Sequence, residues 1–164
     1  MSKNPSFEKL NVLIVEDNFL MQQLLKEILR SFHIREYRTA NDGADGLQEL
    51  QTFHADIVIV DWNMEILDGI DFTRLVRTSS DIHDPHVPII MLTGYNEAKH
   101  IVEARDAGAT EYLIKPVSAK TLYERFCTVI EKPRPFVKTS TFIGPDRRRT
   151  PATERTNKGR RSTD

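Results

Sequence analysis

Polar side chains stand directly after four apolar runs of this sequence, at the residues where each run stops. The runs read as buried strands, and unpaired charge is costly at the margin of a core, so charged groups placed there need a reason. If the strands are parallel, their carboxyl ends share one edge of the sheet, where ligands of such sheets bind. The residues at these four ends are Glu16-Asp17, Asp61, Thr93-Gly94 and Lys115-Pro116.

Three carboxylates that converge on one edge repel each other, by roughly 4 kcal/mol for each pair at about 4 Å and an effective dielectric of about 20. Positive charge must offset this repulsion. Mg²⁺ prefers hard oxygen ligands, one or two carboxylates among them, and Lys115 adds a fixed cation. Each residue alone is more simply a solvated group or a helix cap. Together they indicate a phosphoryl site, in which Asp61 attacks, the cations hold the oxygens and Thr93 binds the product.

The rest of the chain predicts the elements that bring these residues together. Apolar runs indicate strands at residues 11–15, at 37–40, in the Ile and Val run ending at Asp61, at 87–92 and at 111–114. Helical spacing indicates helices from Asn18 to about Phe32, then at 44–53, 70–77 and 96–107, and a last one capped by Ser118. Strands that alternate with helices predict an α/β fold, a doubly wound five-stranded parallel sheet.

The motif set resembles the signature of the response-regulator receiver domain of two-component signalling, over about residues 10–131. The resemblance implies the flavodoxin-like strand order 2-1-3-4-5 and phosphorylation of Asp61 by a phosphohistidine. It implies that Asp17, Asp61 and the main-chain carbonyl of Asn63 hold Mg²⁺, with Glu16 acting mostly through a water.

The resemblance also implies roles on the other side of the site. Lys115 would bridge to the phosphoryl group and Thr93 would move to meet it. Tyr112 matches the aromatic switch position, whose ring turns inward on activation. The Lys115-Pro116 peptide bond is expected to be cis.

Two positions depart from the family pattern: Glu65 stands where proline is common, and the bulky Tyr95 occupies a position that tunes phosphoryl lifetime. Neither removes a residue needed for phosphorylation. A haloacid-dehalogenase-type phosphatase also uses a strand-end aspartate, but it needs a second aspartate two residues later as general acid. Here that residue is Asn63, and we expect no cap domain in this sequence, so we do not favour the phosphatase alternative.

Composition limits the remaining possibilities. The 164 residues suffice for one sizeable core, and no apolar run is long enough to span a bilayer or to resemble a secretory signal. We therefore expect a cytoplasmic protein without membrane insertion. The net charge of −1 hides an asymmetry: residues 1–132 carry 14 basic and 21 acidic residues, whereas residues 133–164 carry 9 and 3.

The basic segment predicts a flexible tail. We divide the chain into an N-terminal extension (1–9), a receiver domain (10–132) and an arginine-rich, disordered tail (133–164). Arginine with aspartate suits a guanine nucleotide, and the arrangement resembles the tails of CheY-like cyclic di-GMP effectors. The candidate nucleotide-binding residues are Asp146, Arg147, Arg148, Arg149, Arg160 and Arg161.

The leading hypothesis is a CheY-like single-domain response regulator, a phosphoacceptor rather than an enzyme with its own substrate. Its phosphodonor would be a sensor histidine kinase or phosphotransfer protein, and its output would be contact with a protein such as the flagellar motor or a signalling enzyme. Two alternatives stay open: a basic tail that binds nucleic acid, which we favour less, and a phosphorelay or chemotaxis-like shuttle with an inert tail.

Overall fold

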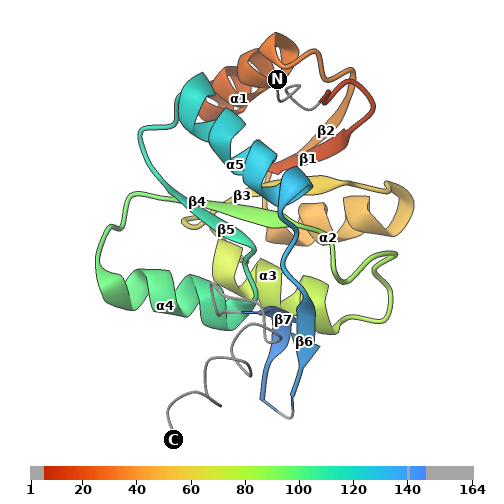
Figure 1. The fold of residues 1–164 in the computed structure, drawn as a ribbon, viewed down its shortest axis with the longest axis vertical. Coiled ribbons are helices and arrows are strands. Elements are labelled where there is room, and N and C mark those ends of the chain that lie inside the picture. The colour runs from red at the N-terminus through yellow and green to blue at the C-terminus, as the bar shows by residue number, and fades with distance from the viewer. Residues whose placement is uncertain (1–5, 140, 147–164) are drawn as a thin grey trace, which may run out of the picture.

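A parallel five-stranded sheet lies between two layers of helices in the computed structural model, which describes residues 6–139 and 141–146. The strands follow the order β2-β1-β3-β4-β5 and all pair in parallel (Figure 1). The fold class and strand order predicted from the sequence are confirmed. The sheet strands are β1 (Asn11–Val15), β2 (Glu36–Ala40), β3 (Ile57–Asp61), β4 (Ile89–Thr93) and β5 (Glu111–Ile114).

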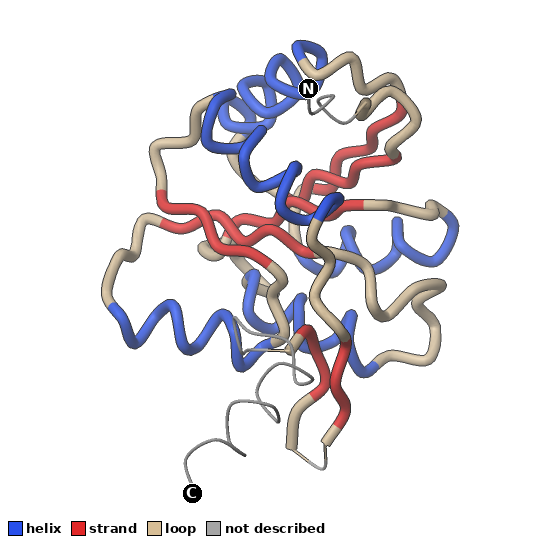
Figure 2. Tube along the Cα trace, viewed as in Figure 1, coloured by secondary structure: helices blue, strands red, loops and turns tan. Residues whose placement is uncertain are grey.

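The helices cover both faces of the sheet: α1 and α5 lie on one side, and α2, α3 and α4 on the other (Figure 2 shows the same view by element type). Alternate residues of the central strands point into two separate cores. Leu13, Val58 and Val60 face the α2–α4 side, whereas Val12, Ile57 and Ile59 face the α1–α5 side. The helices are α1 (Phe19–Ser31), α2 (Gly43–Thr52), α3 (Gly69–Thr78), α4 (Ala98–Ala107) and α5 (Ala119–Glu131).

Side-chain caps start four of the five helices just beyond the strand ends. Asn18, Asp42 and Asp68 each accept a hydrogen bond from the backbone N–H three residues later, and Ser118 forms a capping box with Thr121. Because these caps fix where each helix begins, they also fix the loops that carry the strand-end residues. Among the described residues, no helix is both long and apolar enough to cross a membrane.

The N-terminal extension contributes to the core, which the sequence did not indicate. The ring of Phe7 is 3% exposed and lies 5.4–5.9 Å from the rings of Phe32, Tyr123 and Phe126. This aromatic cluster joins the start of the chain to α1 and α5.

The segment that we expected to be flexible from residue 133 begins instead with a hairpin. β6 (Phe136–Lys138) pairs antiparallel with β7 (Ile143–Pro145), and the hairpin lies beside α3 on the α2–α4 side of the sheet (Figure 1). Its neighbour Gly108 precedes β5, so the hairpin lies toward the amino ends of the strands, whereas Asp61 is at the carboxyl end of β3. The hairpin backbone comes so close that a Cβ on Gly144 would lie 3.0 Å from the Cα of Gly108. The described part of the tail is therefore packed on the sheet domain.

A buried arginine holds this hairpin. Arg77 is 3% exposed, and its guanidinium donates to the carbonyls of Val87 (2.7 Å), Pro85 (2.8 Å) and Gly108 (3.0 Å). Burial lowers the pKa of Arg77 to about 9. The ring of Phe136 lies 4.9 Å from the guanidinium carbon and stacks on His86 at 3.9 Å, so the hairpin covers a cation that water cannot reach.

We predict that Phe136→Ala lowers the free energy of unfolding by about 2 kcal/mol, because it removes a cation–π contact with a desolvated guanidinium together with apolar packing. Lys138→Ala, at an exposed position of the same strand, should change it by less than about 0.5 kcal/mol. Urea denaturation of the full chain measures both values. Equal stabilities of the two variants would show that the hairpin does not pack on the sheet domain.

Candidate functional site

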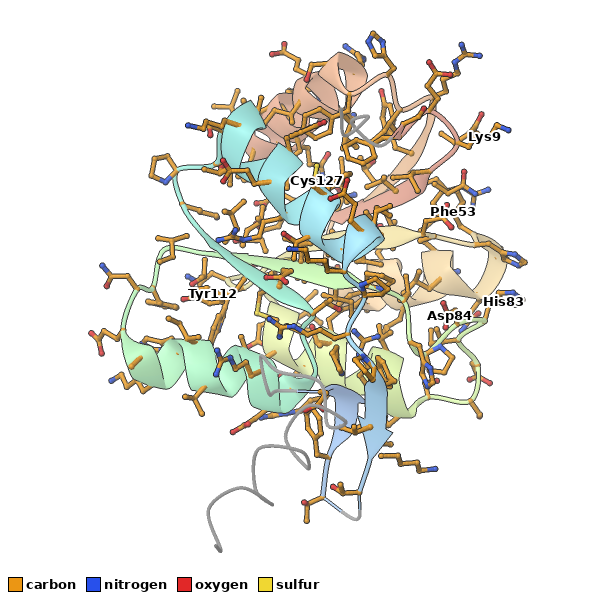
Figure 3. The ribbon with its side chains drawn as sticks, in the orientation of Figure 1. Lys9, Phe53, His83, Asp84, Tyr112 and Cys127 are labelled. Carbon is orange, nitrogen blue, oxygen red and sulfur yellow. The ribbon has the colours of Figure 1, made fainter. Side chains whose placement is uncertain are left out.

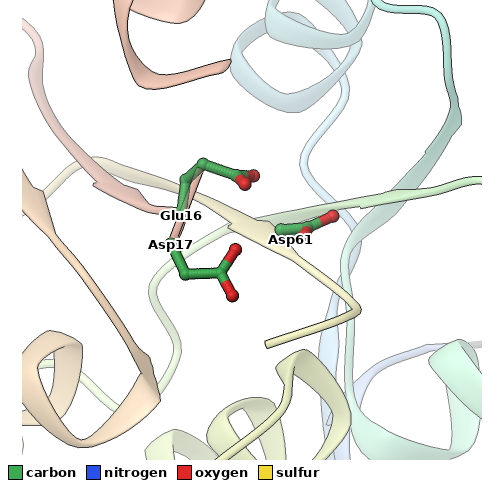
Figure 4. A group of neighbouring side chains, drawn as sticks. All are labelled: Glu16, Asp17 and Asp61. Atoms are coloured by element: carbon green, nitrogen blue, oxygen red, sulfur yellow. The ribbon is translucent and has the colours of Figure 1, made fainter. Parts of the chain in front are cut away.

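The predicted acidic residues meet at the carboxyl edge of the sheet. Asp61 is the last residue of β3, and Glu16 and Asp17 follow β1, the neighbouring strand. One carboxylate oxygen from each of the three lies within 4.8 Å of the others, and Figure 4 shows the three side chains around one point. Asp61 and Glu16 are buried and Asp17 is exposed, so the cluster is open to solvent on one side.

A glycine makes room for the loop after Asp61. A Cβ on Gly69 would lie 2.6 Å from the main-chain oxygen of Asp61 and 2.9 Å from the Cα of Trp62. The start of α3 therefore packs directly on the end of β3. This contact explains the Asp68-Gly69 pair, in which the aspartate caps the helix and the glycine permits the close approach.

Lys115 supplies the positive charge expected beside Asp61. Its Nζ lies 2.7 Å from Oδ1 of Asp61, and the lysine side chain is 33% exposed, compared with 5% for the aspartate. Burial raises the pKa of Asp61 above its ordinary value, and the hydrogen bond from Lys115 acts in the opposite direction. The Lys115-Pro116 bond is cis, as the sequence predicted.

Glu16 is the most deeply buried acid of the cluster. Its side chain is 1% exposed, Oε1 accepts a hydrogen bond from the N–H of Asn18 at 3.1 Å, and Oε2 is buried with no hydrogen-bond partner among the described residues. Burial, together with the charge of Asp61, raises the pKa of Glu16 to about 7.

The acidic cluster fits a hard divalent cation. It offers three carboxylates within ligand distance of one another, and the unpartnered Oε2 of Glu16 is the kind of buried oxygen that a cation or its water shell would satisfy. Beside the cluster, Asp17, Asn63 and Asp68 line a hollow of about 300 Å³. The sequence-predicted metal residues are therefore grouped in space.

Thr93 and Tyr112 lie on the β4–β5 side of the site and are connected through Tyr95. Thr93 is 1% exposed, and its Oγ1 accepts the N–H of Tyr95 at 2.9 Å. The hydroxyl of Tyr112 donates to the main-chain carbonyl of Tyr95. Burial raises the pKa of Tyr112. One loop residue thus contacts both predicted switch residues.

Sequence reasoning missed the aromatic group that holds Tyr95. The Tyr95 ring stacks on His100 of α4 at 4.4 Å, and the ring of Trp62 meets both edge-on at 5.6 Å. The Tyr95 hydroxyl reaches Oδ1 of Asn63 at 3.4 Å. The position of His100 in the sequence has no regular relation to the strand ends. Only its contacts with Trp62 and Tyr95 in the folded chain identify it as part of the site.

Gln22 is a second residue that the sequence did not indicate. It is 6% exposed, and its Nε2 donates to the main-chain carbonyl of Glu16 at 2.5 Å and to Oδ1 of Asn41 at 3.1 Å. It fixes the backbone that carries the acidic pair. The sequence signal that could have identified Gln22 is a glutamine next to the apolar positions of a predicted helix.

Of the candidate nucleotide-binding residues of the tail, the structure describes only Asp146, which does not lie at this site. Asp146 is 5% exposed, at the end of the hairpin, and its N–H donates to the carbonyl of Pro135 at 2.7 Å. It is therefore not displayed on the surface. The other five, Arg147, Arg148, Arg149, Arg160 and Arg161, lie outside the described residues.

Known proteins resemble this chain in sequence and in fold. The sequence profile of the family described as the response regulator receiver domain matches residues 12–126. The chemotaxis protein CheY-3 of Vibrio cholerae is 32% identical over 125 residues, which make up 76% of this chain and 95% of that protein.

Two solved structures have a similar fold. The chemotaxis response regulator CheY4 of Vibrio cholerae has 32% identity and a TM-score of 0.65, covering 71% of this chain and 95% of that one. The receiver domain of sensor histidine kinase PA1611 from Pseudomonas aeruginosa has 28% identity and a TM-score of 0.63, covering 73% and 94%. The latter structure contains a magnesium ion coordinated in its active-site cleft.

We predict a pH-dependent stability that originates at Glu16. Its pKa of about 7 in the folded chain exceeds the ordinary 4.5, so its contribution is complete below about pH 4.5 and is lost as the pH rises through 7. Without Mg²⁺, the free energy of unfolding should fall by about 2.5 kcal/mol more between pH 5 and 8 in the wild type than in Glu16→Gln.

Denaturation curves at each pH measure this difference, with Glu8→Gln, at an exposed position, as the control. Saturating Mg²⁺ should diminish the loss, because metal binding favours ionised carboxylates. The same slope in the wild type and Glu16→Gln would refute the assignment to Glu16.

Proposed function

The chain belongs to the response regulator receiver domain family, and we propose that it is a signalling protein phosphorylated on Asp61 by a histidine kinase or phosphotransfer protein. The observation that supports this best is the contact of 2.7 Å between Lys115 and Asp61, beside the carboxylates of Glu16 and Asp17. A buried carboxylate that contacts a lysine and neighbours two further carboxylates suits the attack on a phosphoryl group.

In the transfer, an oxygen of Asp61 forms a bond to phosphorus while the bond between phosphorus and the donor imidazole nitrogen breaks. The electron pair of that bond stays on the imidazole nitrogen. The imidazole leaves as a neutral group, because the other ring nitrogen of the phosphohistidine already carries a proton. The product is an acyl phosphate. Lys115 already forms an ion pair with Asp61. It can therefore stabilise the negative charge that develops on the phosphoryl oxygens.

We assign Mg²⁺ to the acidic cluster, with Asp17, Asp61 and the Asn63 carbonyl as its ligands and Glu16 acting through water. The support is the cluster of three carboxylates and the unpartnered oxygen of Glu16. A bound Mg²⁺ would supply positive charge to the phosphoryl oxygens. Lys115 adds its own charge through the ion pair with Asp61.

The signal leaves the site through the β4–β5 side. Thr93 turns from the N–H of Tyr95 to the phosphoryl group, and the loop that carries Tyr95 moves with it. Tyr112 follows, because its hydroxyl is bonded to the carbonyl of Tyr95. The output is contact with a protein target, such as the flagellar motor or a signalling enzyme. The protein catalyses only its own phosphorylation and dephosphorylation.

An apolar patch beside the site suits the phosphodonor. Phe19, Leu20 and Leu24 of α1 are 69%, 77% and 40% exposed, and Leu20 and Leu24 line the same 500 Å³ hollow as Asp61 and Lys115. A donor must bring its phosphohistidine to Asp61 while covering this patch. A helical surface with apolar side chains would do both.

The arginine-rich tail remains the candidate segment for cyclic di-GMP. Its support is the sequence pattern of arginine with aspartate, and the hairpin gives it a fixed starting point at Asp146. A tail that binds nucleic acid is the alternative, and a shuttle with an inert tail is the third possibility.

We predict that a phosphorylated phosphotransfer protein, or acetyl phosphate with Mg²⁺, labels the wild type with a phosphate that hydroxylamine releases, as expected of an acyl phosphate. Asp61→Asn should reduce the label to background, because it removes the attacking oxygen. Asp81→Asn, at an exposed position of the α3–β4 loop, should keep it. Full labelling of Asp61→Asn would place the phosphate elsewhere and end the proposal.

For the tail, we predict that Arg147→Ala combined with Arg148→Ala abolishes cyclic di-GMP binding in calorimetry and leaves Asp61 phosphorylation intact. Arg35→Ala combined with Arg74→Ala removes the same charge from exposed positions of the sheet domain and should bind normally. Unchanged affinity of the tail variant contradicts the cyclic di-GMP assignment. Binding of arbitrary DNA with a steep salt dependence would support the nucleic-acid alternative.

A further inference from the structure

Three arginines surround a small cavity that the phosphorylation site does not use. Arg105 comes from the last turn of α4, Arg125 from α5 and Arg134 from the segment between α5 and β6. The cavity has a volume of about 230 Å³, and Glu111 and Tyr112 of β5 form part of its wall. Figure 3 shows Tyr112 on the side of β5 that faces α4.

The guanidinium groups around this cavity make few hydrogen bonds or ion pairs with the described residues. The side chain of Arg105 is half-buried and makes no hydrogen bond or ion pair with the described residues. In the described part of the chain, Arg125 donates only its Nε, to the carbonyl of Tyr112 at 3.2 Å. Arg134 lies 3.8 Å from the Glu111 carboxylate, an ion pair without a hydrogen bond. Several N–H donors of the arginines that line this cavity therefore have no hydrogen-bond partner within residues 6–139 and 141–146.

The hairpin completes the site. Arg134 precedes Pro135, whose carbonyl accepts the N–H of Asp146 at 2.7 Å, and Phe136 is held on Arg77. The position of Arg134 thus depends on the hairpin, which clamps the chain just after α5. Without that clamp the cavity would have two arginines, both from helices.

We propose that this cavity binds a phosphate group of a small molecule. Three arginines and one glutamate leave a net charge of +2 on its wall, which matches a phosphate dianion better than a carboxylate. Phosphate also offers a third oxygen to planar guanidinium groups that donate in pairs. The volume is below the roughly 300 Å³ of the smallest drug-sized sites, so the cavity takes the phosphate and leaves the rest of a larger ligand outside.

The test is a titration of the full chain, free of Mg²⁺ and at constant ionic strength, followed by the NMR signals of the arginine Nε–H groups. The probes are inorganic phosphate, AMP and acetate. We expect saturable shifts at Arg105, Arg125 and Arg134 with phosphate and AMP, and weaker binding of acetate. Tighter binding of AMP than of phosphate assigns the group to a larger ligand, and equal binding assigns it to free phosphate.

Arg105→Gln should weaken phosphate binding about tenfold or more, since one charge-assisted hydrogen bond accounts for that factor. It should fold normally, because this side chain has no partner among the described residues. Arg74→Gln, on the exposed face of α3, should bind within about twofold of the wild type. Arg105→Lys, which keeps the charge and loses the planar fork, should fall between the two.

Three results would overturn the proposal: shifts that do not saturate, equal weakening by Arg105→Gln and Arg74→Gln, or acetate binding as tight as phosphate. Asp61→Asn separates this site from the phosphorylation site, because it should bind phosphate normally whether or not Asp61 is the phosphoacceptor. Loss of binding in Asp61→Asn would move the bound phosphate to the acidic cluster and also overturn the proposal.

Discussion

The structure depends on keeping negative charge at the carboxyl edge of a parallel sheet, where two of the three clustered carboxylates are buried. Asp61 ends a strand whose residues are all buried, and the Glu16 carboxylate lies beside it with one oxygen unpartnered. Such an arrangement is stable when positive charge lies within a few ångströms or when one of the carboxylates takes up a proton. Lys115 supplies part of the compensating positive charge, and the negative charge that it leaves unbalanced favours binding of a cation. The helix caps and Gly69 serve this arrangement, because they hold the loops against the strand ends.

The opposite edge of the sheet shows the reverse case. There the buried charge is positive, and Arg77 is satisfied by three main-chain carbonyls and by the face of Phe136. The described residues around Arg77 therefore offset its charge without an outside ligand. The two edges therefore differ: the buried arginine is paired by described groups of the chain, whereas the three carboxylates at the other edge are only partly offset by Lys115.

The fold could be predicted from the sequence because each central strand is an unbroken apolar run that ends in a distinctive residue. Asp61, Thr93 and Lys115 stand where apolar periodicity itself places them, so their convergence follows from parallel topology. The hairpin could not be predicted in this way. β6 and β7 have three residues each, too few for a periodic signal, and their stability comes from long-range contacts with Arg77 and Gly108. The same holds for Phe7 and His100, whose partners are distant in the sequence.

The aromatic group beside the site has an optical consequence. Trp62 is the chain's single tryptophan, is bonded directly to Asp61 and packs edge-on against Tyr95 and His100. Its ring is 6% exposed. Any change in charge at Asp61, or any shift of the Tyr95 loop, alters the surroundings of one indole and of no other. The natural protein thus carries its own fluorescent reporter, without a dye or a substitution, for events at the carboxyl edge of the sheet.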